Sequence, residues 1–392
     1  MVKEAIIMKT LQIGGNSPYG GGTYLVIRWC EFLISKGWQV DILSTEPSMM
    51  NEVKKIKGAR IIHDILIPRN IDPASDIKAF SQLCSLIKKE QYDVIHTYTA
   101  TPGFLGRLSA FLMGTPVILH HQAGWTVTEF SGLKERIVYT PLEYLASLIS
   151  TKAICVSHAT YQQGKKYHMA PLNKMKVICN GIDPQPLLNA TQDGSKETMR
   201  KTLGFSDDHI LIGNTGRLAS QKDNKSLIQS IPYVKSMIPG KPFTLLLAGT
   251  GPDFHDLENL IKSLDISDHV RLLGFVREIP SFLVAIDIFA GPSLWEGLSI
   301  SILEAMAAGK PIVTTSILPN AELIENEVTG LVVPPKSPEE IAKAIVHLIN
   351  DPELSKKCGK NAQERVLESY SIDRMFRETY DLYVSSNSPV NK

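Results

Sequence analysis

The sequence lacks the cysteine patterns of disulfide-stabilised and zinc-binding proteins. Its 392 residues include five cysteines, an odd number, and none of them forms a C-x-x-C pair. The five are scattered along the chain at Cys30, Cys84, Cys155, Cys179 and Cys358. This spacing argues against a secreted disulfide framework and against a cysteine zinc site, so a reducing compartment is expected.

The chain also lacks a dominant charge and a long apolar run. Its formal net charge is +1, from 41 lysines and arginines against 40 acidic residues. No global attraction to nucleic acid follows from that balance, so no nucleic-acid partner is expected. The apolar run in residues 1–15 is broken by Glu4 and Lys9, and it is too short for a signal peptide or a membrane span. We therefore expect a cytoplasmic protein.

What the sequence does contain is a repeated alternation of short β-rich runs and helical stretches. In the first half we expect strands at 6–13, 39–44, 61–67, 93–97, 117–121, 153–157 and 176–179, with helices at 23–35, 76–89, 103–113 and 133–149. In the second half we expect strands at 210–215, 243–248, 270–274, 286–290, 311–315 and 330–333. Continuous apolar runs are typical of parallel strands that are covered on both faces. The sequence therefore predicts an α/β protein with two doubly wound, Rossmann-like domains.

A change in composition near residue 184 predicts where one domain ends. Pro184, Pro186 and the polar stretch 189–195 make a poor core and a good linker. We expect an N-terminal domain at 1–183, a linker at 184–204 and a C-terminal domain at 205–369.

In open α/β sheets, ligands bind at the carboxyl ends of the strands, so residues that directly follow strands are the candidates. Gly216, Arg217 and Lys222 follow the first strand of the second half. An arginine fork and a mobile lysine can together hold a diphosphate. Two solvated surface cations are the alternative, and these residues alone do not decide between them.

Two further loops carry weaker signals. Gly249 and Gly251 follow the next strand and would allow a tight turn and a close approach of the backbone to a ligand. Phe275 ends the strand after that, where it could lie against a base or belong to the core. No G-x-G-x-x-G fingerprint opens either half, which argues against a nicotinamide dehydrogenase.

The most informative segment contains two glutamates, Glu296 and Glu304. Gly309 followed by Pro311 is a helix-stop signature, which predicts a helix over about 299–308. Glu304 would lie inside this helix among apolar residues, where an unpaired carboxylate costs several kcal/mol. We expect it to accept hydrogen bonds from ligand hydroxyls or to face a cation, with an ion pair to a neighbouring arginine as the alternative. The free amides before the helix suit a phosphate, and they belong to Gly297, Leu298 and Ser299.

With these residues the sequence resembles the retaining glycosyltransferase family 4, which has the two-domain GT-B fold. The matches occur in order along the whole chain: the glycines from Gly14 to Gly22, Asn180-Gly-Ile-Asp183, Gly216-Arg217 with Lys222, Gly249-Thr-Gly-Pro252 and Glu296-x7-Glu304-Ala-Met-Ala. The resemblance implies two Rossmann-like domains that face each other across a cleft. It also implies that a helix at about 370–386 crosses back onto the N-terminal domain.

The resemblance implies a role for each matching residue. Glu304 would bind the ribose of a nucleotide-sugar donor, and Glu296 would contact the donor sugar. Arg217 and Lys222 would stabilise the departing diphosphate, assisted by the amides after Glu296. Gly21 and Gly22 would let a loop approach the donor phosphates, and Gly249 and Phe275 would line the donor site. The chain has no D-x-D pair, so neither a metal nor another cofactor is expected.

This chain departs from the family pattern at three places on the sugar side. It has Thr23-Tyr24 where an acidic residue is common, and residues 316–320 where the family has a glycine-rich loop. The family also has a strand-end histidine that contacts the donor sugar. His120 and His121 are both candidates, and an alignment anchored on the following Gly-Trp would put Ala123 there; we favour His121.

The sequence thus predicts a retaining hexosyltransferase-type enzyme that uses a nucleotide-sugar donor and a carbohydrate or lipid-linked acceptor. A sugar-nucleotide epimerase or hydrolase on the same frame, and a non-catalytic sugar-nucleotide-binding subunit, are the alternatives. One segment, which contains Tyr167 and Met169, could touch the inner face of a membrane weakly. It is flanked by four lysines, Lys165, Lys166, Lys174 and Lys176. A solvated face is the favoured interpretation of that segment.

Overall fold

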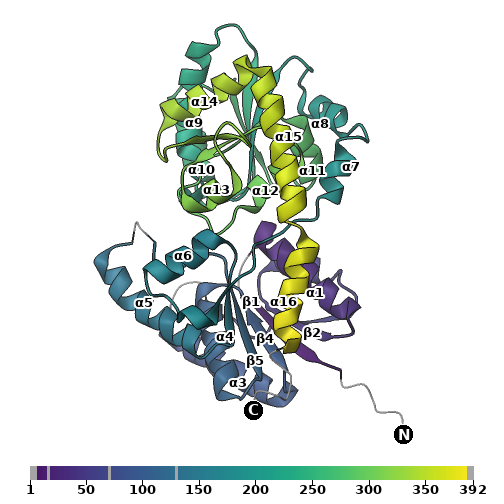
Figure 1. Cartoon of the computed structure of the whole chain (residues 1–392), viewed down its shortest axis with the longest axis vertical. Helices are drawn as coiled ribbons and strands as arrows, with labels where there is room; N and C mark the ends of the chain where they lie inside the picture. Colours follow the sequence, from purple (N-terminus) through teal and green to yellow (C-terminus); the bar gives the residue numbers. More distant parts are fainter. Residues whose placement is uncertain (1–6, 16–17, 69–71, 129–130, 386–392) are drawn as a thin grey trace. The chain divides into compact units, whose positions relative to one another are not determined.

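The structure is a computed structural model that describes residues 7–15, 18–68, 72–128 and 131–385. The chain divides into two compact units, one of residues 1–179 with 374–392 and the other of residues 180–373. Each unit contains one parallel sheet covered by helices (Figure 1). The expected first strand began at Ile6 and the expected last helix ended at Ser386, and both of these end residues lie outside the described parts.

In the N-terminal unit, the described residues form a seven-stranded sheet in the order β3-β2-β1-β4-β5-β6-β7. Its strands are β1 Lys9–Gly15, β2 Gln39–Ser44, β3 Ala59–Ile62, β4 Val94–Thr97, β5 Val117–Gln122, β6 Lys152–Cys155 and β7 Met175–Val177. All the neighbouring pairs run parallel. The order reverses between β1 and β4, which is the switch point where this kind of sheet binds ligands.

Helices cover both faces of this sheet. They are α1 Gly21–Ser35, α2 Pro47–Val53, α3 Pro73–Glu90, α4 Ala100–Leu112, α5 Leu133–Leu148, α6 His158–Lys166 and α16 Ile372–Ser385, with a short 3₁₀ turn at Leu172–Lys174. Helix α3 begins three residues before the expected start at 76, because Pro73 occupies the first helical position, where proline costs no hydrogen bond.

The C-terminal helix α16 is tied into the N-terminal unit by one buried tyrosine. The hydroxyl of Tyr383 accepts hydrogen bonds from Gln12 Nε2 at 3.0 Å and Trp29 Nε1 at 3.1 Å. It also lies 3.0 Å from His96 Nδ1. Around it, aromatic rings from α1 and α16 pack edge to face or tilted, such as Trp29 and Phe376 with ring centroids 5.3 Å apart. This packing makes the helix part of the core of the N-terminal unit.

In the C-terminal unit, the described residues form a six-stranded parallel sheet in the order β10-β9-β8-β11-β12-β13. Its strands are β8 Ile210–Thr215, β9 Phe243–Ala248, β10 Val270–Gly274, β11 Ile288–Gly291, β12 Ile312–Thr315 and β13 Leu331–Val333. Every residue of β9 is buried, as its continuous apolar sequence predicts. The switch point of this sheet lies between β8 and β11.

The helices of this unit pack on both sheet faces, and the first two of them precede its first strand in sequence. They are α7 Gln185–Ala190, α8 Ser195–Leu203, α9 Asn224–Met237, α10 Phe254–Ser263, α11 Ile279–Ala285, α12 Ile300–Ala307, α13 Leu318–Leu323, α14 Pro338–Asn350 and α15 Pro352–Ser369, with a 3₁₀ turn at Ser220–Lys222. No described helix is long and apolar enough to cross a membrane.

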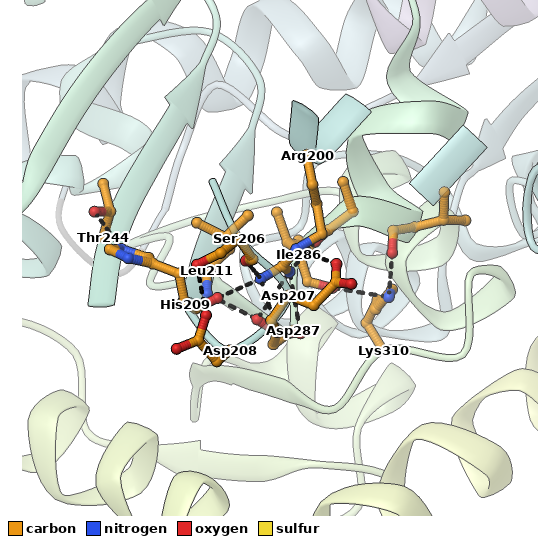
Figure 2. Close-up of polar contacts among 12 residues, drawn as sticks. Arg200, Ser206, Asp207, Asp208, His209, Leu211, Thr244, Ile286, Asp287 and Lys310 are labelled. Carbon is orange, nitrogen blue, oxygen red and sulfur yellow. Dashed lines mark hydrogen bonds and ion pairs between the residues drawn. The ribbon is translucent and has the colours of Figure 1, made fainter. Parts of the chain in front are cut away.

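The segment 184–204, expected to be a linker, instead forms helices α7 and α8 of the C-terminal unit. A fully buried arginine on α8 holds it there (Figure 2). Arg200 donates hydrogen bonds to the carbonyls of Ala285 and Ser206, each at 2.8 Å, and pairs with Asp287 at 3.3 Å. The polar composition resembled a linker because this one long side chain, rather than an apolar stripe, anchors the helix.

Strand β3 ends well before its expected end, whereas the other strands differ from expectation by at most a few residues at their ends. The run 61–67 was expected to be extended throughout, but β3 ends at Ile62. Its only neighbour in the sheet is β2, which ends at Ser44, and Leu43 is already opposite Ile62. Beyond that point the described chain offers β3 no partner, although Ile65 and Ile67 remain buried.

Candidate functional site

The candidate donor site lies at the switch point of the C-terminal sheet. Strands β8 and β11 are neighbours there, and the loops that follow them leave the same carboxyl edge. The first loop carries Lys222 and the second carries Glu296, so the sheet brings together two residues that are 74 positions apart. A doubly wound sheet binds its ligands at this place.

Lys222 and Glu296 form an ion pair with 2.5 Å between Nζ and Oε1. Their side chains are only 17% and 8% exposed, so water screens the pair weakly. The same carboxylate accepts a hydrogen bond from Ser293 Oγ at 2.8 Å and a longer one from Gln221 Nε2 at 3.3 Å. Glu296 is therefore held in place by three donors from two loops.

Gln221 and Ser293 are site residues that the motif analysis missed. The backbone amide of Leu294 donates to the carbonyl of Gln221 at 2.8 Å, and Gln221 Nε2 donates to the carbonyl of Trp295 at 2.9 Å. These bonds join the two loops independently of the ion pair. Their positions in the sequence could have identified them, because both residues lie within three positions of a predicted site residue. The motif analysis missed them because neither belongs to a family motif.

Glu304 lies on α12, as expected, and its environment disfavours charge. Burial raises the pKa of Glu304 to about 7, although the charge of Lys222 lowers it in part. Within the described parts of the chain, its carboxyl group has neither a hydrogen-bond partner nor an ion-pair partner, so the expected alternative of a neighbouring arginine is not what the structure has. A carboxyl group in this position is available to hydroxyl donors from outside the chain.

The start of α12 presents backbone amides next to this carboxyl. Ser299 is the N-cap residue, but its side chain makes no capping hydrogen bond and lies 3.1 Å from the hydroxyl of Ser301. In the described part of the chain, the N-cap side chain therefore leaves the first-turn amides of α12 uncapped. Gly297 and Leu298, which precede Ser299, are buried in the loop from β11. The helix dipole adds a partial positive charge at this point.

Arg217 and Lys222 differ in their surroundings. The Lys222 side chain folds back toward Gly216. A Cβ added to Gly216 would lie 3.6 Å from the Cε atom of Lys222. Arg217 is exposed. Gly216 has φ of +133°, a region that other residues rarely adopt, and this conformation sets the direction of the loop that carries both cations.

The glycines after β9 are required by packing within the chain. A Cβ on Gly249 would lie 1.8 Å from the carbonyl oxygen of Gly216, and one on Gly251 would lie 2.1 Å from that of Leu218. The close approach that we expected toward a ligand is thus made first of all between two loops of the protein. Phe275, beyond the next strand, is 58% exposed and is not part of the core.

In the N-terminal unit, the two candidate histidines of β5 point to opposite faces of the sheet. His120 is buried, its Nδ1 lies 2.8 Å from Thr97 Oγ1, and it packs so closely on Gly103 that a Cβ there would meet its ring at 2.7 Å. Burial and the charge of Arg107 hold the pKa of His120 well below its usual range. His120 is therefore a structural residue, whereas His121 is partly exposed.

His121 lies beside a polar cluster that the sequence analysis did not identify. Its ring centroid is 5.6 Å from that of Tyr98 and 6.1 Å from that of His96. Tyr98 donates to Gln12 Oε1 at 2.6 Å. Burial keeps the pKa of His96 well below its usual range, so this histidine is neutral near pH 7. The cluster lies around the carboxyl end of β4, beside β1 at the switch point of the sheet.

The glycines Gly21 and Gly22 form the first residues of α1, at the carboxyl edge of the same sheet. A Cβ added to Gly22 would meet no described atom within 4 Å. Nothing described inside the chain therefore requires glycine at that position. The approach of a donor phosphate stays a prediction.

In the segment that was expected to touch a membrane, the two apolar side chains named for that role are less exposed than expected. Met169 is fully buried, so it cannot act as an anchor. Tyr167 is partly buried beneath two cations, with Arg136 at 5.1 Å and Lys166 at 5.3 Å from its ring centroid. Leu172, which lies between the two lysine pairs and is 53% exposed, is instead an exposed apolar side chain of this segment.

A cavity of about 720 Å³ in the C-terminal unit lies away from these residues, at the amino ends of β8, β11 and β12. Lys310 lines it, and the Lys310 amine donates to the carbonyls of Val284 and Ile286 at 2.9 and 2.8 Å. Burial lowers the pKa of Lys310 to about 8. These carbonyls accept two of the amine hydrogens, and the candidate donor site is at the opposite edge of the sheet.

Comparisons with known proteins agree with the site. A family model described as Glycosyltransferase Family 4 matches residues 19–186, and one described as Glycosyl transferases group 1 matches residues 195–365. The chain is 30% identical over 320 residues, 81% of each protein, to the UDP-Gal:alpha-D-GlcNAc-diphosphoundecaprenol alpha-1,3-galactosyltransferase of Escherichia coli. It is 26% identical to the capsular polysaccharide biosynthesis glycosyltransferase CapM of Staphylococcus aureus, over 90% of this chain and 91% of that protein.

Solved structures show the same fold. The crystal structure of Anabaena HepE in complex with UDP and glucose matches with a TM-score of 0.82 at 20% identity, over 96% of this chain and 100% of that one. The family resemblance inferred from the motifs is thus confirmed. The chain belongs to glycosyltransferase family 4 and is a glycosyltransferase of the GT-B fold class, with two Rossmann-like parallel-sheet units.

Proposed function

We propose that this glycosyltransferase moves a hexose from a nucleotide-diphosphate sugar to a lipid-linked saccharide, with retention of the anomeric configuration. The observation that carries the proposal is the unpartnered carboxyl of Glu304 beside the Lys222–Glu296 pair. A hydroxyl-rich, anionic ligand would satisfy both features, since ribose hydroxyls donate to the carboxylate and the diphosphate attracts the lysine.

The chemistry requires charge stabilisation at the leaving group. As the sugar–phosphate bond breaks, negative charge builds on the diphosphate, where Lys222, Arg217 and the first-turn amides of α12 would stabilise it. In front-face attack, a leaving phosphate oxygen takes the proton of the acceptor hydroxyl. The new bond then forms on the face from which the diphosphate departs, so the configuration is retained. No side chain is required as a general base, and the proposal assigns none.

We propose that these cationic groups hold the diphosphate without a divalent ion. The support is the composition of the loops after β8 and β11, which offer cations and amides, together with the absence of a D-x-D pair from the sequence. The Escherichia coli relative is named for transfer to GlcNAc-diphosphoundecaprenol, which supports an acceptor of the polyprenyl-diphosphate class.

The test is a transfer assay with purified protein. UDP-, GDP- and ADP-hexoses are offered with a short-chain polyprenyl-diphosphate GlcNAc acceptor, and NMR of the product gives its anomeric configuration. Transfer should persist in excess chelator. Donor consumption without an acceptor would instead indicate a hydrolase or epimerase, and donor binding without any turnover would indicate a binding subunit. An inverted product would refute retention.

Variants of the two glutamates test the roles assigned to them. Glu304→Gln should raise the donor KM more than it lowers kcat, because a ribose contact is similar before and during the reaction. Glu296→Gln should lower kcat more, because a contact to the reacting sugar strengthens in the transition state. Glu353→Gln, an exposed residue on α15, is the matched control and should behave as wild type. If Glu304→Gln abolished kcat with KM unchanged, the assignment would be wrong.

A further inference from the structure

The cavity at the amino ends of β8, β11 and β12 is lined by four lysines from three separate segments. Lys196 lies on α8, Lys310 follows α12, and Lys356 and Lys360 lie on α15. Because Lys356 and Lys360 are four positions apart on a helix, they share one face of α15. The cavity has a volume of about 720 Å³, which is within the range of small-molecule sites. Three segments thus gather positive charge around a space of ligand size.

Among the described residues, one acidic side chain lines the cavity, that of Asp287, and its charge is already balanced. The carboxylate pairs with the buried guanidinium of Arg200 at 3.3 Å and accepts a hydrogen bond from the backbone amide of Leu211 at 2.8 Å (Figure 2). Asp351, the N-cap residue of α15, is not part of the lining, and it accepts a hydrogen bond from the amide of Leu354 at 2.9 Å. Within this described lining, the lysines therefore have no free carboxylate to neutralise them.

The lysine amines have hydrogens available for a ligand. The Lys310 amine donates to two backbone carbonyls, at 2.9 and 2.8 Å, and an ammonium group has three hydrogens. Lys360 pairs with Glu364 at 3.6 Å, in an exposed pair of the kind that contributes little. In the parts of the chain that the structure describes, neither Lys196 nor Lys356 forms an ion pair. Four like charges around one cavity repel one another, and a bound anion would offset that repulsion.

Other parts of the lining are apolar. Ile288 and Leu348 are both buried, and they line the cavity together with Pro311. Ser355, in the first turn of α15, adds a hydroxyl group. A bare anion would leave the apolar wall uncovered. The combination of cations and apolar side chains therefore suits a ligand that has an anionic group and an apolar body.

We propose that this lysine-lined cavity binds a small phosphate ester, with the phosphate among the lysines and the organic group against the apolar wall. A phosphate ester presents three strong acceptor oxygens and almost two negative charges, which matches several ammonium donors. The cavity is separate from the candidate donor site, because Lys222 and Glu296 lie at the opposite edge of the same sheet. The inference goes beyond the proposed function, since it concerns a second ligand and needs neither donor nor acceptor.

The experiment is calorimetric titration of the full chain with phenyl phosphate and, separately, with inorganic phosphate. Phenyl phosphate should bind more tightly, because only its ring can cover the apolar wall. Lys356→Gln/Lys360→Gln should weaken the binding of phenyl phosphate at least about tenfold, since charge-assisted hydrogen bonds are lost. Lys262→Gln/Lys357→Gln removes two exposed lysines of the same unit outside the cavity. It is the matched control and should bind as wild type.

A second readout reports on Lys310 itself. Burial lowers the pKa of Lys310 to about 8; the charge of Asp287 opposes this shift, and those of Lys196 and Arg200 add to it. Phenyl phosphate is fully ionised at pH 8, so in the cavity it should raise the pKa of Lys310. Binding at pH 8 should then take up as much as about half a proton. Titrations in buffers of different ionisation enthalpy measure this uptake, which Lys310→Gln should abolish.

The proposal is wrong if wild type shows no saturable binding of phenyl phosphate, or if Lys356→Gln/Lys360→Gln binds it as wild type does. Loss of binding in Lys222→Met alone would place the ligand at the donor site and would also overturn the proposal. Equal affinity for inorganic phosphate would exclude the contact with the apolar wall. Melting curves check that each variant folds. Sugar transfer without phenyl phosphate should be unchanged in Lys356→Gln/Lys360→Gln, so a failure of the proposed function is visible separately.

Discussion

The carboxyl group of Glu304 makes a quantitative prediction, because burial raises its pKa from an ordinary 4.5 to about 7. Between these two values the folded protein binds more protons than the unfolded chain. The free energy of unfolding therefore falls as the pH rises through this window, and it levels off above pH 7. A tenfold difference in proton affinity corresponds to about 1.4 kcal/mol, so ionisation of Glu304 destabilises the fold by up to about 3 kcal/mol at pH 8. Glu304→Gln cannot ionise at this position, so it should lack this pH-dependent fall in the free energy of unfolding.

The same group links donor binding to protons. In the proposed donor complex, ribose hydroxyls would donate to the ionised carboxylate, so a bound donor should lower the pKa of Glu304 toward its ordinary value. Binding then releases a proton below pH 7. If the pKa falls fully to the ordinary value, donor affinity should rise about thirtyfold between pH 5.5 and pH 8. Glu304→Gln should bind the donor more weakly than wild type does at pH 8 and should show no such rise.

Urea unfolding and calorimetric titration at several pH values between about 5 and 8 check both effects. A nucleotide sugar is the appropriate probe, because its diphosphate has no proton to lose in this range. Titrations in buffers of different ionisation enthalpy count the proton released, and Glu353→Gln is the matched control. The reasoning is refuted if the difference in unfolding free energy between wild type and Glu304→Gln is independent of pH. If Glu304→Gln released as many protons as wild type when it binds the donor, Glu304 would not belong to the donor site.

Three further predictions concern other parts of the fold and site. Tyr383→Phe removes the acceptor of the buried Trp29 indole, so the free energy of unfolding should fall by about 1–3 kcal/mol in urea titrations; no loss would mean that the cluster is relaxed. Gly249→Ala forces apart the loops after β8 and β9, so it should weaken donor binding measured by calorimetry, whereas Gly132→Ala, whose Cβ meets no described atom within 4 Å and whose φ is −68°, should not. Lys222→Met removes the charge that lowers the pKa of Glu304, so the pH at which stability levels off should move upward from about 7; an unmoved profile would exclude that coupling.

The sequence predicted most of the sheet architecture because the strands are unusually well marked. Four expected strands, 39–44, 210–215, 243–248 and 270–274, coincide with those in the structure. The run 243–248, for example, is almost wholly apolar and is bounded by Pro242 and Gly249. The helix expected at 299–308 spans Ile300–Ala307, with its cap at Ser299. The linker was the main error, because composition does not reveal that a single buried arginine can anchor a polar helix.

Contacts between distant segments could not be predicted in the same way. The motifs placed Lys222 and Glu296 at one edge of a sheet, but they did not indicate that the two residues would pair with each other. Similarly, Tyr383 meets Gln12 across 371 positions of sequence. Helix α5 shows the same limit, because apolar residues such as Leu133 are exposed on it. An apolar periodicity predicts an amphipathic helix, and only the neighbouring elements decide which face is buried.

The position of Lys222 explains why single substitutions in this site will not give separable energies. Its amine pairs with Glu296 and also lowers the pKa of Glu304, so it acts on both carboxyl groups. Without a donor, the Lys222–Glu296 pair is neutral, and Glu304 is about half protonated near pH 7. Under the proposed function, an incoming diphosphate would compete with Glu296 for the lysine, and ribose would favour ionisation of Glu304. Removing any one of the three groups changes the charge state or the partner of the others, so their effects should be measured in double-mutant cycles rather than added.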